Sequence, residues 1–179
     1  MKGKSMKIAI LGYSGSGKST LARKLGEVYE LPVLHFDRVQ FRPNWEIRPQ
    51  KSKEVMTKAF LDLHKDWVID GNYSKLYFER RMAEADVIIL LLFGRLSCLN
   101  RVHRRYRKHK DSFRPDMADG CKEKLDWEFV KWVLRDGRSK EVRERYNGVI
   151  ARYPEKTIVI KNQRQLNAVQ DYINKVITK

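Results

Sequence analysis

Cysteine is scarce in this sequence. The two cysteines, Cys98 and Cys121, lie far apart and form no CxxC pair. A disulfide scaffold or a structural zinc site needs more cysteines at closer spacing, so the sequence argues against both. Two separate thiols are typical of a protein in a reducing compartment, and we expect a cytoplasmic protein.

Long apolar runs are also missing. The run Ile8–Leu11, which follows a basic start, is too short for a signal peptide, and Val87–Phe93 is too short to span a bilayer. We therefore expect no membrane partner. Internal repeats and low-complexity linkers are absent as well, so the 179 residues favour one compact domain over residues 1–179.

Acidic residues are outnumbered by basic ones. Asp and Glu total 22 against 38 Lys and Arg, which gives a net charge of +16. Such an excess attracts polyanions, whether nucleotides, nucleic acid or anionic membranes, and does not distinguish among them. It is concentrated between Arg95 and Arg114, where Asp111 is the only acid.

Short apolar runs alternate with helical patterns along the chain. Because the runs are nearly continuous in apolar residues and are separated by helices, they indicate an α/β fold with a parallel sheet covered on both faces. Ligands of such folds bind beyond the carboxyl ends of the strands. The expected strands are Ile8–Leu11, Leu31–Phe36, Trp67–Asp70, Val87–Leu92 and Thr157–Ile160.

Two of the expected helices carry specific predictions. One opens at Pro49, and we expect its inner side to hold Val55, Met56, Ala59, Phe60 and Leu63. The other is a long helix with an apolar face at Leu125, Phe129, Trp132 and Val133, and we expect it to continue through Arg135 and Arg138. Trp127 and Trp132 are expected in the core.

A phosphate-binding motif follows the first strand. The segment Gly12-Tyr13-Ser14-Gly15-Ser16-Gly17-Lys18-Ser19-Thr20 fits GxxxxGK[ST] and precedes a helix. Its glycines let backbone N–H groups face a phosphate, and the helix N-terminus adds positive charge. Lys18 is expected to reach the β- and γ-phosphates of a nucleoside triphosphate, and the Ser19 hydroxyl to bind Mg²⁺. The sequence therefore predicts ATP with magnesium as the ligand.

Two carboxylates follow the next strands. Asp70 ends the strand Trp67–Asp70, where a carboxylate beside the phosphate loop would hold magnesium; a turn residue is the alternative, because Asp-Gly favours turns. Asp37 follows the second strand and could orient an acceptor hydroxyl or take its proton. It could equally be a helix cap or an ion-pair partner. His35 is expected to be a half-buried strand residue rather than a base.

The basic stretch after the fourth strand has helical spacing. Arg101 and Arg105 are four residues apart and share a face. Arginines stabilise the negative charge that spreads over the oxygens in phosphoryl transfer, so we expect a catalytic pair. The alternative is a solvated basic face. The segment from about 108 to 124 lacks strong periodicity and is expected to be a lid.

These motifs together resemble the adenylate-kinase-like branch of P-loop kinases. Asp70-Gly71-Asn72-Tyr73 is similar to the Asp-Gly-Phe-Pro segment of adenylate kinases but lacks its Phe-Pro, and Arg101 and Arg105 match the arginine pair before the lid. Nearly the whole chain resembles the DNA topology modulation protein family. The matching segments are Gly15–Ala22, Asp70–Tyr73, Arg114–Ala118 and Lys124–Glu128. The resemblance implies the P-loop NTPase fold, a five-stranded sheet in the order 2-3-1-4-5, and a kinase-like site.

Three functions remain open at this point. The first is a kinase that moves the γ-phosphoryl group of ATP to an unidentified small acceptor, a nucleotide or an alcohol. The second is an ATP-binding regulator associated with DNA, with weak, non-specific nucleic-acid binding on its basic surface. The third is a plain ATPase. The kinase is favoured, because the arginines cluster near the expected lid rather than spreading along the chain.

Overall fold

The strands form one parallel sheet. The computed structural model describes residues 6–109, 117, 120–121 and 125–177. In this part of the chain five strands pair in parallel in the order β2-β3-β1-β4-β5, which confirms the predicted fold class. The strands are β1 (Lys7–Gly12), β2 (Val33–His35), β3 (Trp67–Asp70), β4 (Val87–Leu91) and β5 (Thr157–Ile160).

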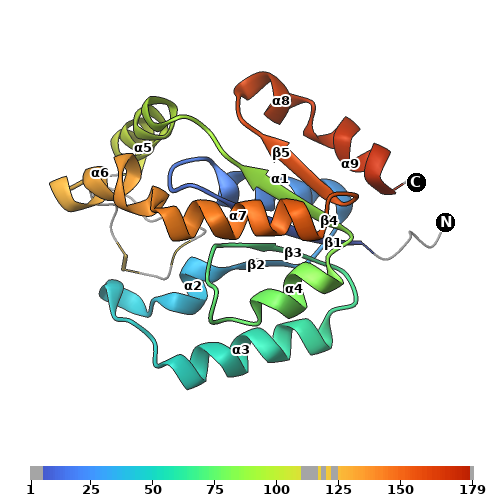
Figure 1. Cartoon of the computed structure of the whole chain (residues 1–179). Coiled ribbons are helices and arrows are strands. Elements are labelled where there is room, and N and C mark those ends of the chain that lie inside the picture. The colour runs from blue at the N-terminus through green and yellow to red at the C-terminus, as the bar shows by residue number, and fades with distance from the viewer. Residues whose placement is uncertain (1–5, 110–116, 118–119, 122–124, 178–179) are drawn as a thin grey trace.

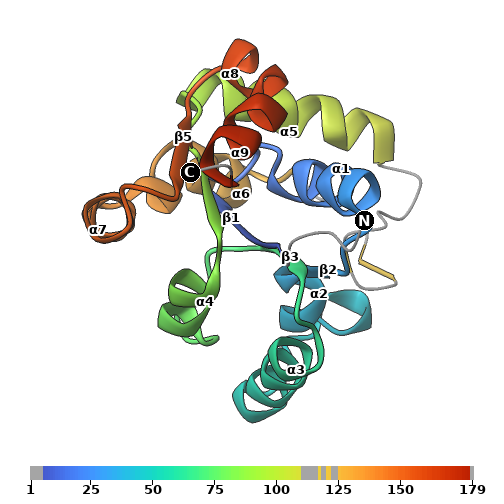
Figure 2. The same cartoon turned by 90° about the vertical axis from the view of Figure 1, so that its right-hand side faces the viewer.

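Helices cover both faces of the sheet. Figures 1 and 2 show α1, α5 and α9 on one face and α2, α4 and α7 on the other. The described helices are α1 (Lys18–Tyr29), α2 (Phe36–Gln40), α3 (Gln50–Leu63), α4 (Phe78–Glu84), α5 (Arg95–His109), α6 (Trp127–Leu134), α7 (Lys140–Arg152), α8 (Gln163–Asn167) and α9 (Val169–Ile177), with 3₁₀ turns η1 (Pro43–Trp45) and η2 (Asp136–Arg138).

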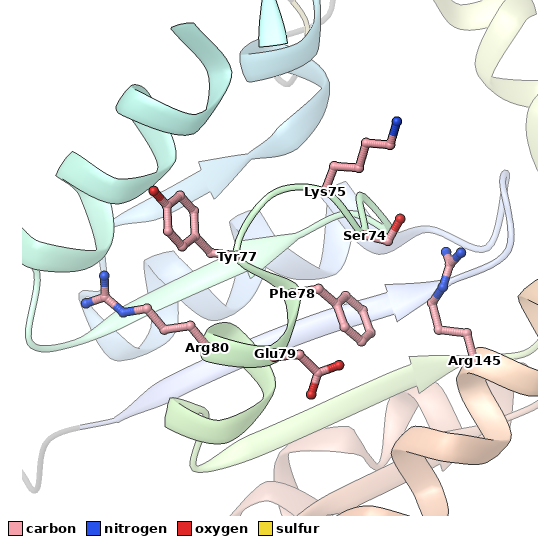
Figure 3. Close-up of a pocket in the computed structure, with 7 residues that line it drawn as sticks. All are labelled: Ser74, Lys75, Tyr77, Phe78, Glu79, Arg80 and Arg145. Atoms are coloured by element: carbon pink, nitrogen blue, oxygen red, sulfur yellow. The ribbon is translucent and has the colours of Figure 1, made fainter. Parts of the chain in front are cut away.

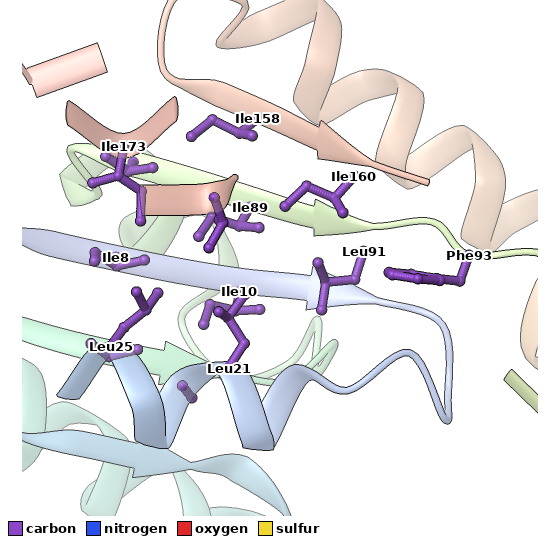
Figure 4. Close-up of a cluster of buried hydrophobic side chains, with 14 of the residues drawn as sticks. Ile8, Ile10, Leu21, Leu25, Ile89, Leu91, Phe93, Ile158, Ile160 and Ile173 are labelled. Atoms are coloured by element: carbon purple, nitrogen blue, oxygen red, sulfur yellow. The ribbon is translucent and has the colours of Figure 1, made fainter. Parts of the chain in front are cut away.

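The central strand β1 belongs to both cores. Ile8 and Ile10 face the first core, which contains α1 and α9 (Figure 4), and Ala9 and Leu11 face the second. All four side chains are fully buried. Burying one such branched aliphatic side chain contributes about 1.5–3 kcal/mol. This packing holds the carboxyl ends of β1, β3 and β4 at one edge of the sheet.

Helix α3 presents a different face to the protein than its sequence predicts. Lys53, Thr57 and Leu61 are buried, whereas Val55 is 61% and Leu63 76% exposed. The predicted inner side is therefore wrong except at Phe60, which is half-buried and packs against the second core. Two contacts explain the polar face, because the Lys53 ammonium donates to Gln40 Oε1 at 2.9 Å and Thr57 Oγ1 donates to the Lys53 carbonyl at 2.8 Å.

Helix α6 is shorter than predicted. It ends at Leu134, because Arg135 has non-helical backbone angles (φ −134°, ψ −68°), and Arg138 belongs to η2 instead. The chain then returns so closely that a Cβ at Gly137 would lie 2.9 Å from Trp132 Nε1. The two tryptophans of α6 are not in the core, since Trp127 is 77% and Trp132 47% exposed.

The predicted lid, residues 108–124, falls mostly outside the described residues. Of its described part, Cys121 is buried, accepts from the Trp45 N–H at 3.3 Å and donates to the Arg42 carbonyl at 3.4 Å. Gly120 lies against Asn44. The end of this segment therefore packs on the loop around η1. None of the described helices has the length and apolar character needed to cross a membrane.

The contact between α1 and β2 can be tested with two glycines. A Cβ at Gly26 would lie 2.2 Å from Val33 Cγ2, whereas a Cβ at Gly148, in α7, meets nothing within 4 Å. Gly148→Ala should stabilise the protein by about 0.5–1 kcal/mol through helix propensity. Gly26→Ala should destabilise it, because overpacking costs about 1–3 kcal/mol and outweighs that gain. Urea unfolding measures both; equal shifts of the two midpoints in one direction would contradict the packing.

Candidate functional site

Three glycines let the loop after β1 curl tightly. Gly12, Gly15 and Gly17 have φ of 143°, 76° and 97°, in the region that side chains disfavour. A Cβ at Gly12 would lie 2.4 Å from the Leu91 carbonyl oxygen, and one at Gly15 would lie 2.6 Å from Val102 Cγ2. The loop thus fits against β4 and α5 only with glycine at these positions.

The curled loop leaves polar groups for a ligand. Helix α1 starts directly after Gly17, and no side chain caps its N-terminus. Free N–H groups at such a position bind phosphate, and the helix dipole favours negative charge there. The Ser16 hydroxyl is buried and has no hydrogen-bond partner among the described residues. Ser19 lies in the first turn of α1, and both it and Lys18 are half-buried.

Lys18 folds back over the loop. Its ammonium donates to the Tyr13 carbonyl at 3.0 Å. Burial lowers the pKa of Lys18, the charges of Asp37 and then Asp70 oppose that by raising it, and Arg105 lowers it further. These effects require the two carboxylates and the guanidinium to lie near the ammonium. Asp37, Asp70 and Arg105 are therefore charged neighbours of Lys18.

Asn72 ties the P-loop to the end of β3. Its side-chain Oδ1 accepts from the Gly12 N–H at 3.0 Å, and its Nδ2 donates to the Gly12 carbonyl at 2.7 Å. One amide side chain thus satisfies both backbone polar groups of Gly12. This arrangement fixes the start of the phosphate loop relative to Asp70, which is two residues away.

Asp70 is paired with a histidine. His35 and Asp70 lie opposite each other in the register of β2 and β3, and Asp70 Oδ1 lies 2.6 Å from His35 Nδ1. Both side chains are largely buried, at 12% and 5% exposed. The pairing occupies one carboxylate oxygen. His35 is therefore a strand residue, as predicted, that also orients Asp70.

Asp37 lies in the first turn of α2, where Tyr73 holds it. The Tyr73 hydroxyl donates to Asp37 Oδ1 at 2.8 Å. Burial, and then the charge of Asp37, raise the pKa of Tyr73 far above its usual value, so the phenol keeps its proton and remains a donor. Asp37 does not cap the helix with its side chain. It is instead a held carboxylate on the side of the site that faces away from α5.

The arginines of α5 lie on the opposite side of the loop. Arg101 Nη1 donates to the Ser16 carbonyl at 3.3 Å, its Nη2 donates to Gln163 Oε1 at 2.6 Å, and its guanidinium stacks over Phe93 at 4.1 Å. Arg105 lies over the ring of Phe129, with 5.8 Å to the ring centroid. Arg101 is therefore next to the P-loop.

The chain after the predicted lid also contacts the P-loop. Trp132 Nε1 donates to Ser14 Oγ at 2.9 Å. The Arg138 guanidinium stacks over Tyr13 at 3.9 Å and donates to the Phe93 carbonyl at 3.0 Å. The hydrogen bond to Ser14 explains why Trp132 lies outside the core, because the loop supplies an acceptor for its indole N–H.

The sequence did not predict the contacts that several of these residues make. Asn72 and Tyr73 lie in the segment singled out after β3, but their partners Gly12 and Asp37 are distant in sequence. Gln163, which binds Arg101, follows β5 and belongs to no motif. Because ligand sites lie at the carboxyl ends of strands, the position of Gln163 just after β5 could have marked it as a candidate site residue.

Comparisons with known proteins place the fold. No protein-family model matches the chain, and no curated protein matches it. A shikimate kinase from Acinetobacter baumannii in complex with shikimate superposes with a TM-score of 0.58 at 16% identity, covering 98% of this chain and 94% of that one.

Two further structures are similar. A deoxyadenosine kinase from M. mycoides, with the products dCMP and dCDP, gives a TM-score of 0.55 at 14% identity and covers 95% of this chain and 100% of its own. An uncharacterized protein from Eubacterium ventriosum gives 0.56 at 16% identity, with 98% and 100% covered. The chain therefore has the P-loop NTPase fold that small-molecule kinases also have.

Proposed function

We propose that this protein is a kinase that binds ATP with magnesium and transfers the γ-phosphoryl group to a small acceptor, a nucleotide or an alcohol. One arrangement carries the proposal. Asn72 joins the P-loop to the segment of Asp70 and Tyr73, and Tyr73 holds Asp37. Arg101 donates to the Ser16 carbonyl within the loop. A phosphate loop alone binds nucleotide. Carboxylates and an arginine at the same loop supply the further groups that phosphoryl transfer uses.

The nucleotide would be held by the P-loop. The glycines at 12, 15 and 17, the uncapped start of α1 and the unpartnered Ser16 hydroxyl fit a polyphosphate. Lys18 would turn from the Tyr13 carbonyl to the phosphates. Arg101 and Arg105 would stabilise the charge on the transferring oxygens, and the planar fork of each could hold two oxygens at once.

Magnesium fits this donor set. The described residues contain no group of three His, Cys, Asp or Glu side chains that could hold a metal ion without help. Mg²⁺ is commonly bound by one or two protein oxygens together with substrate phosphates and water. Ser19 and Asp70 would supply these oxygens, since His35 occupies one carboxylate oxygen of Asp70 and leaves the other. The ion would neutralise charge on the phosphates.

Asp37 would act on the acceptor. It is a carboxylate held by a phenol and placed near Lys18, so it could accept a proton from an acceptor hydroxyl or orient that hydroxyl toward the γ-phosphorus. Held in this way, the carboxylate needs little further ordering in the transition state.

Membership of the DNA topology modulation family remains a proposal that the sequence motifs support. The net charge of +16 would give weak, salt-sensitive binding to nucleic acid. We rank kinase above a DNA-associated regulator and above a plain ATPase, because Asp37 and Tyr73 form a polar site beyond what nucleotide binding requires.

The decisive experiment measures ADP release against a panel of nucleoside monophosphates, nucleosides, sugars and small hydroxy acids, with a sample that contains no acceptor. The kinase proposal expects release that depends on one class of acceptor, together with a phosphorylated product. Equal release in the sample without acceptor would identify an ATPase instead.

The first prediction of the proposed function concerns Lys18. Lys18→Ala should weaken ATP binding at pH 7.5 at least tenfold, because charge-assisted hydrogen bonds worth roughly 1.5–3 kcal/mol each are lost. Burial places the Lys18 pKa below 10.5, and bound phosphate favours the charged form, so wild-type affinity should fall as pH rises through that pKa. Calorimetry from pH 7 to 10 should show the gap between the two proteins narrowing. Lys24→Ala, on an exposed residue of α1, is the control.

The second prediction concerns Asp70. Asp70→Asn should leave ATP binding without metal intact and raise the magnesium concentration at half-saturation, because a neutral amide is a weaker ligand for a hard cation. Asp62→Asn is the matched control, since Asp62 lies at the surface and pairs with Lys58 and Arg80. Identical magnesium titrations of the Asp70 variant and the wild type would remove Asp70 from the metal site.

The third prediction separates catalysis from solvation at α5. Arg101→Lys and Arg105→Lys should each lower kcat while KM for ATP stays near normal, because lysine keeps the charge but lacks the planar fork. An arginine of this kind can contribute about a thousandfold in rate, roughly 4 kcal/mol. Arg104→Lys, on the exposed face of the same helix, should be neutral. Full activity in both test variants would return these arginines to a surface role.

A further inference from the structure

A cavity of about 540 Å³ lies beside the turn that joins β3 to α4 (Figure 3). Most of its lining residues follow directly in sequence after the segment that contains Asp70 and Tyr73. Six of its lining residues come from the turn and the start of α4, and the seventh comes from α7. They are Ser74, Lys75, Tyr77, Phe78, Glu79, Arg80 and Arg145.

The charges around this cavity do not cancel. Arg80 pairs with Asp62 and Glu84, and Glu79 pairs with Arg152 at 2.5 Å. Lys75 and Arg145 have no carboxylate partner among the described residues. The Arg145 guanidinium is half-buried, whereas Lys75 is exposed to solvent. Arg145 therefore keeps its charge at the cavity without an acid among the described residues to neutralise it, and an anion would be the favourable occupant beside it.

The cavity also has an aromatic surface. Figure 3 shows the ring of Phe78 directed toward the side of α7 that carries Arg145. Phe78 and Tyr77 are half-buried, and Arg145 is half-buried as well. A ring beside a half-buried guanidinium suits a ligand that combines a planar or apolar body with a charged end.

Arg145 connects the cavity to the phosphate site. Its Nη1 donates to the Asn72 carbonyl at 3.5 Å, and the side chain of Asn72 holds Gly12 at the start of the P-loop. The next residue, Tyr73, holds Asp37. One short segment thus forms the wall of the cavity and carries the groups that would face the acceptor hydroxyl.

We propose that this cavity binds the non-reacting end of the acceptor, and that the acceptor is a hydroxyl compound with a planar or apolar body and a carboxylate or phosphate group. Arg145 binds the anion, Phe78 packs on the body, and the hydroxyl extends toward Asp37. This assignment rests on the proposed kinase function and narrows its acceptor to one chemical class.

The test compares acceptors that differ only in charge. The pairs are AMP with adenosine, and 4-(hydroxymethyl)benzoate with its uncharged amide. Wild type should phosphorylate a hydroxyl group of the anionic member of at least one pair, and Arg145→Gln should raise KM for that member about tenfold while leaving KM for ATP unchanged. The product must carry the new group on a hydroxyl, because AMP phosphorylated on its phosphate would place the anion at the reacting end. The responding pair tells whether a phosphate or a carboxylate is recognised.

Two variants control for folding and for general charge. Arg145→Lys keeps the charge and should retain much of the preference for the anionic acceptor. It therefore shows whether the rise in KM in the glutamine variant comes from the lost charge. Arg143→Gln removes a charge from an exposed position of the same helix and should leave both KM values unchanged. Melting temperatures of all variants check that the fold is intact.

Calorimetry separates this assignment from the kinase proposal. The same four compounds are titrated into protein saturated with magnesium and a non-hydrolysable ATP analogue, which blocks the P-loop. Binding of an anionic member that Arg145→Gln abolishes would support the subsite. The absence of a phosphorylated product when the same compound is incubated with ATP and magnesium would count against the kinase.

Three results would overturn the assignment. The first is wild-type binding that does not distinguish the members of either pair, or no binding at all. The second is an Arg145→Gln variant that behaves like the wild type. The third is an anion that stimulates ATP turnover through Arg145 without being phosphorylated, because that would identify a regulatory site.

Discussion

The paired hydrogen bonds between the Asn72 side chain and the backbone of Gly12 join the two halves of the candidate site. On one side of this contact lies the P-loop, and on the other lies the segment that carries Asp70 and Tyr73. Neighbouring parallel strands place these segments side by side, but the strands alone do not set how the loops beyond them meet. The Asn72 amide sets how these loops meet, because both of its polar atoms bind Gly12. It thereby fixes the position of the P-loop N–H groups relative to the carboxylates.

Buried arginines stabilise the loops around this contact. Arg81 is fully buried and donates to the carbonyls of Gly71, Tyr73 and Leu76, while its guanidinium stacks on Phe36. Burial lowers the pKa of Arg81 to about 9, so it stays charged at neutral pH. Arg138 has the same role beneath Tyr13. Part of the basic excess is therefore structural, and it supports loops whose carbonyl oxygens would otherwise be unpaired.

The sequence predicted the strands and the P-loop well, because both are local patterns: apolar runs for the strands, and fixed glycine spacing for the loop. It failed where side chains interact across the fold. Nothing local reveals that His35 and Asp70 share a register position, or that Trp132 leaves the core to donate to Ser14. The inner face of α3 was mispredicted for a related reason, since Lys53 can be buried because the Gln40 side chain accepts a hydrogen bond from its ammonium.

The position of β1 at the centre of the sheet affects how the protein can fold during synthesis. The strand leaves the ribosome before the other four strands, yet its two neighbours are β3 and β4, which end at residues 70 and 91. Chains are made at about 5–20 residues per second, so the emerging β1 waits several seconds for both partners. During that time its apolar side chains have no sheet to join. A nascent chain therefore carries the glycine-rich motif long before the strands around it are assembled, and a ligand of the finished loop cannot assist the earliest stages of its folding.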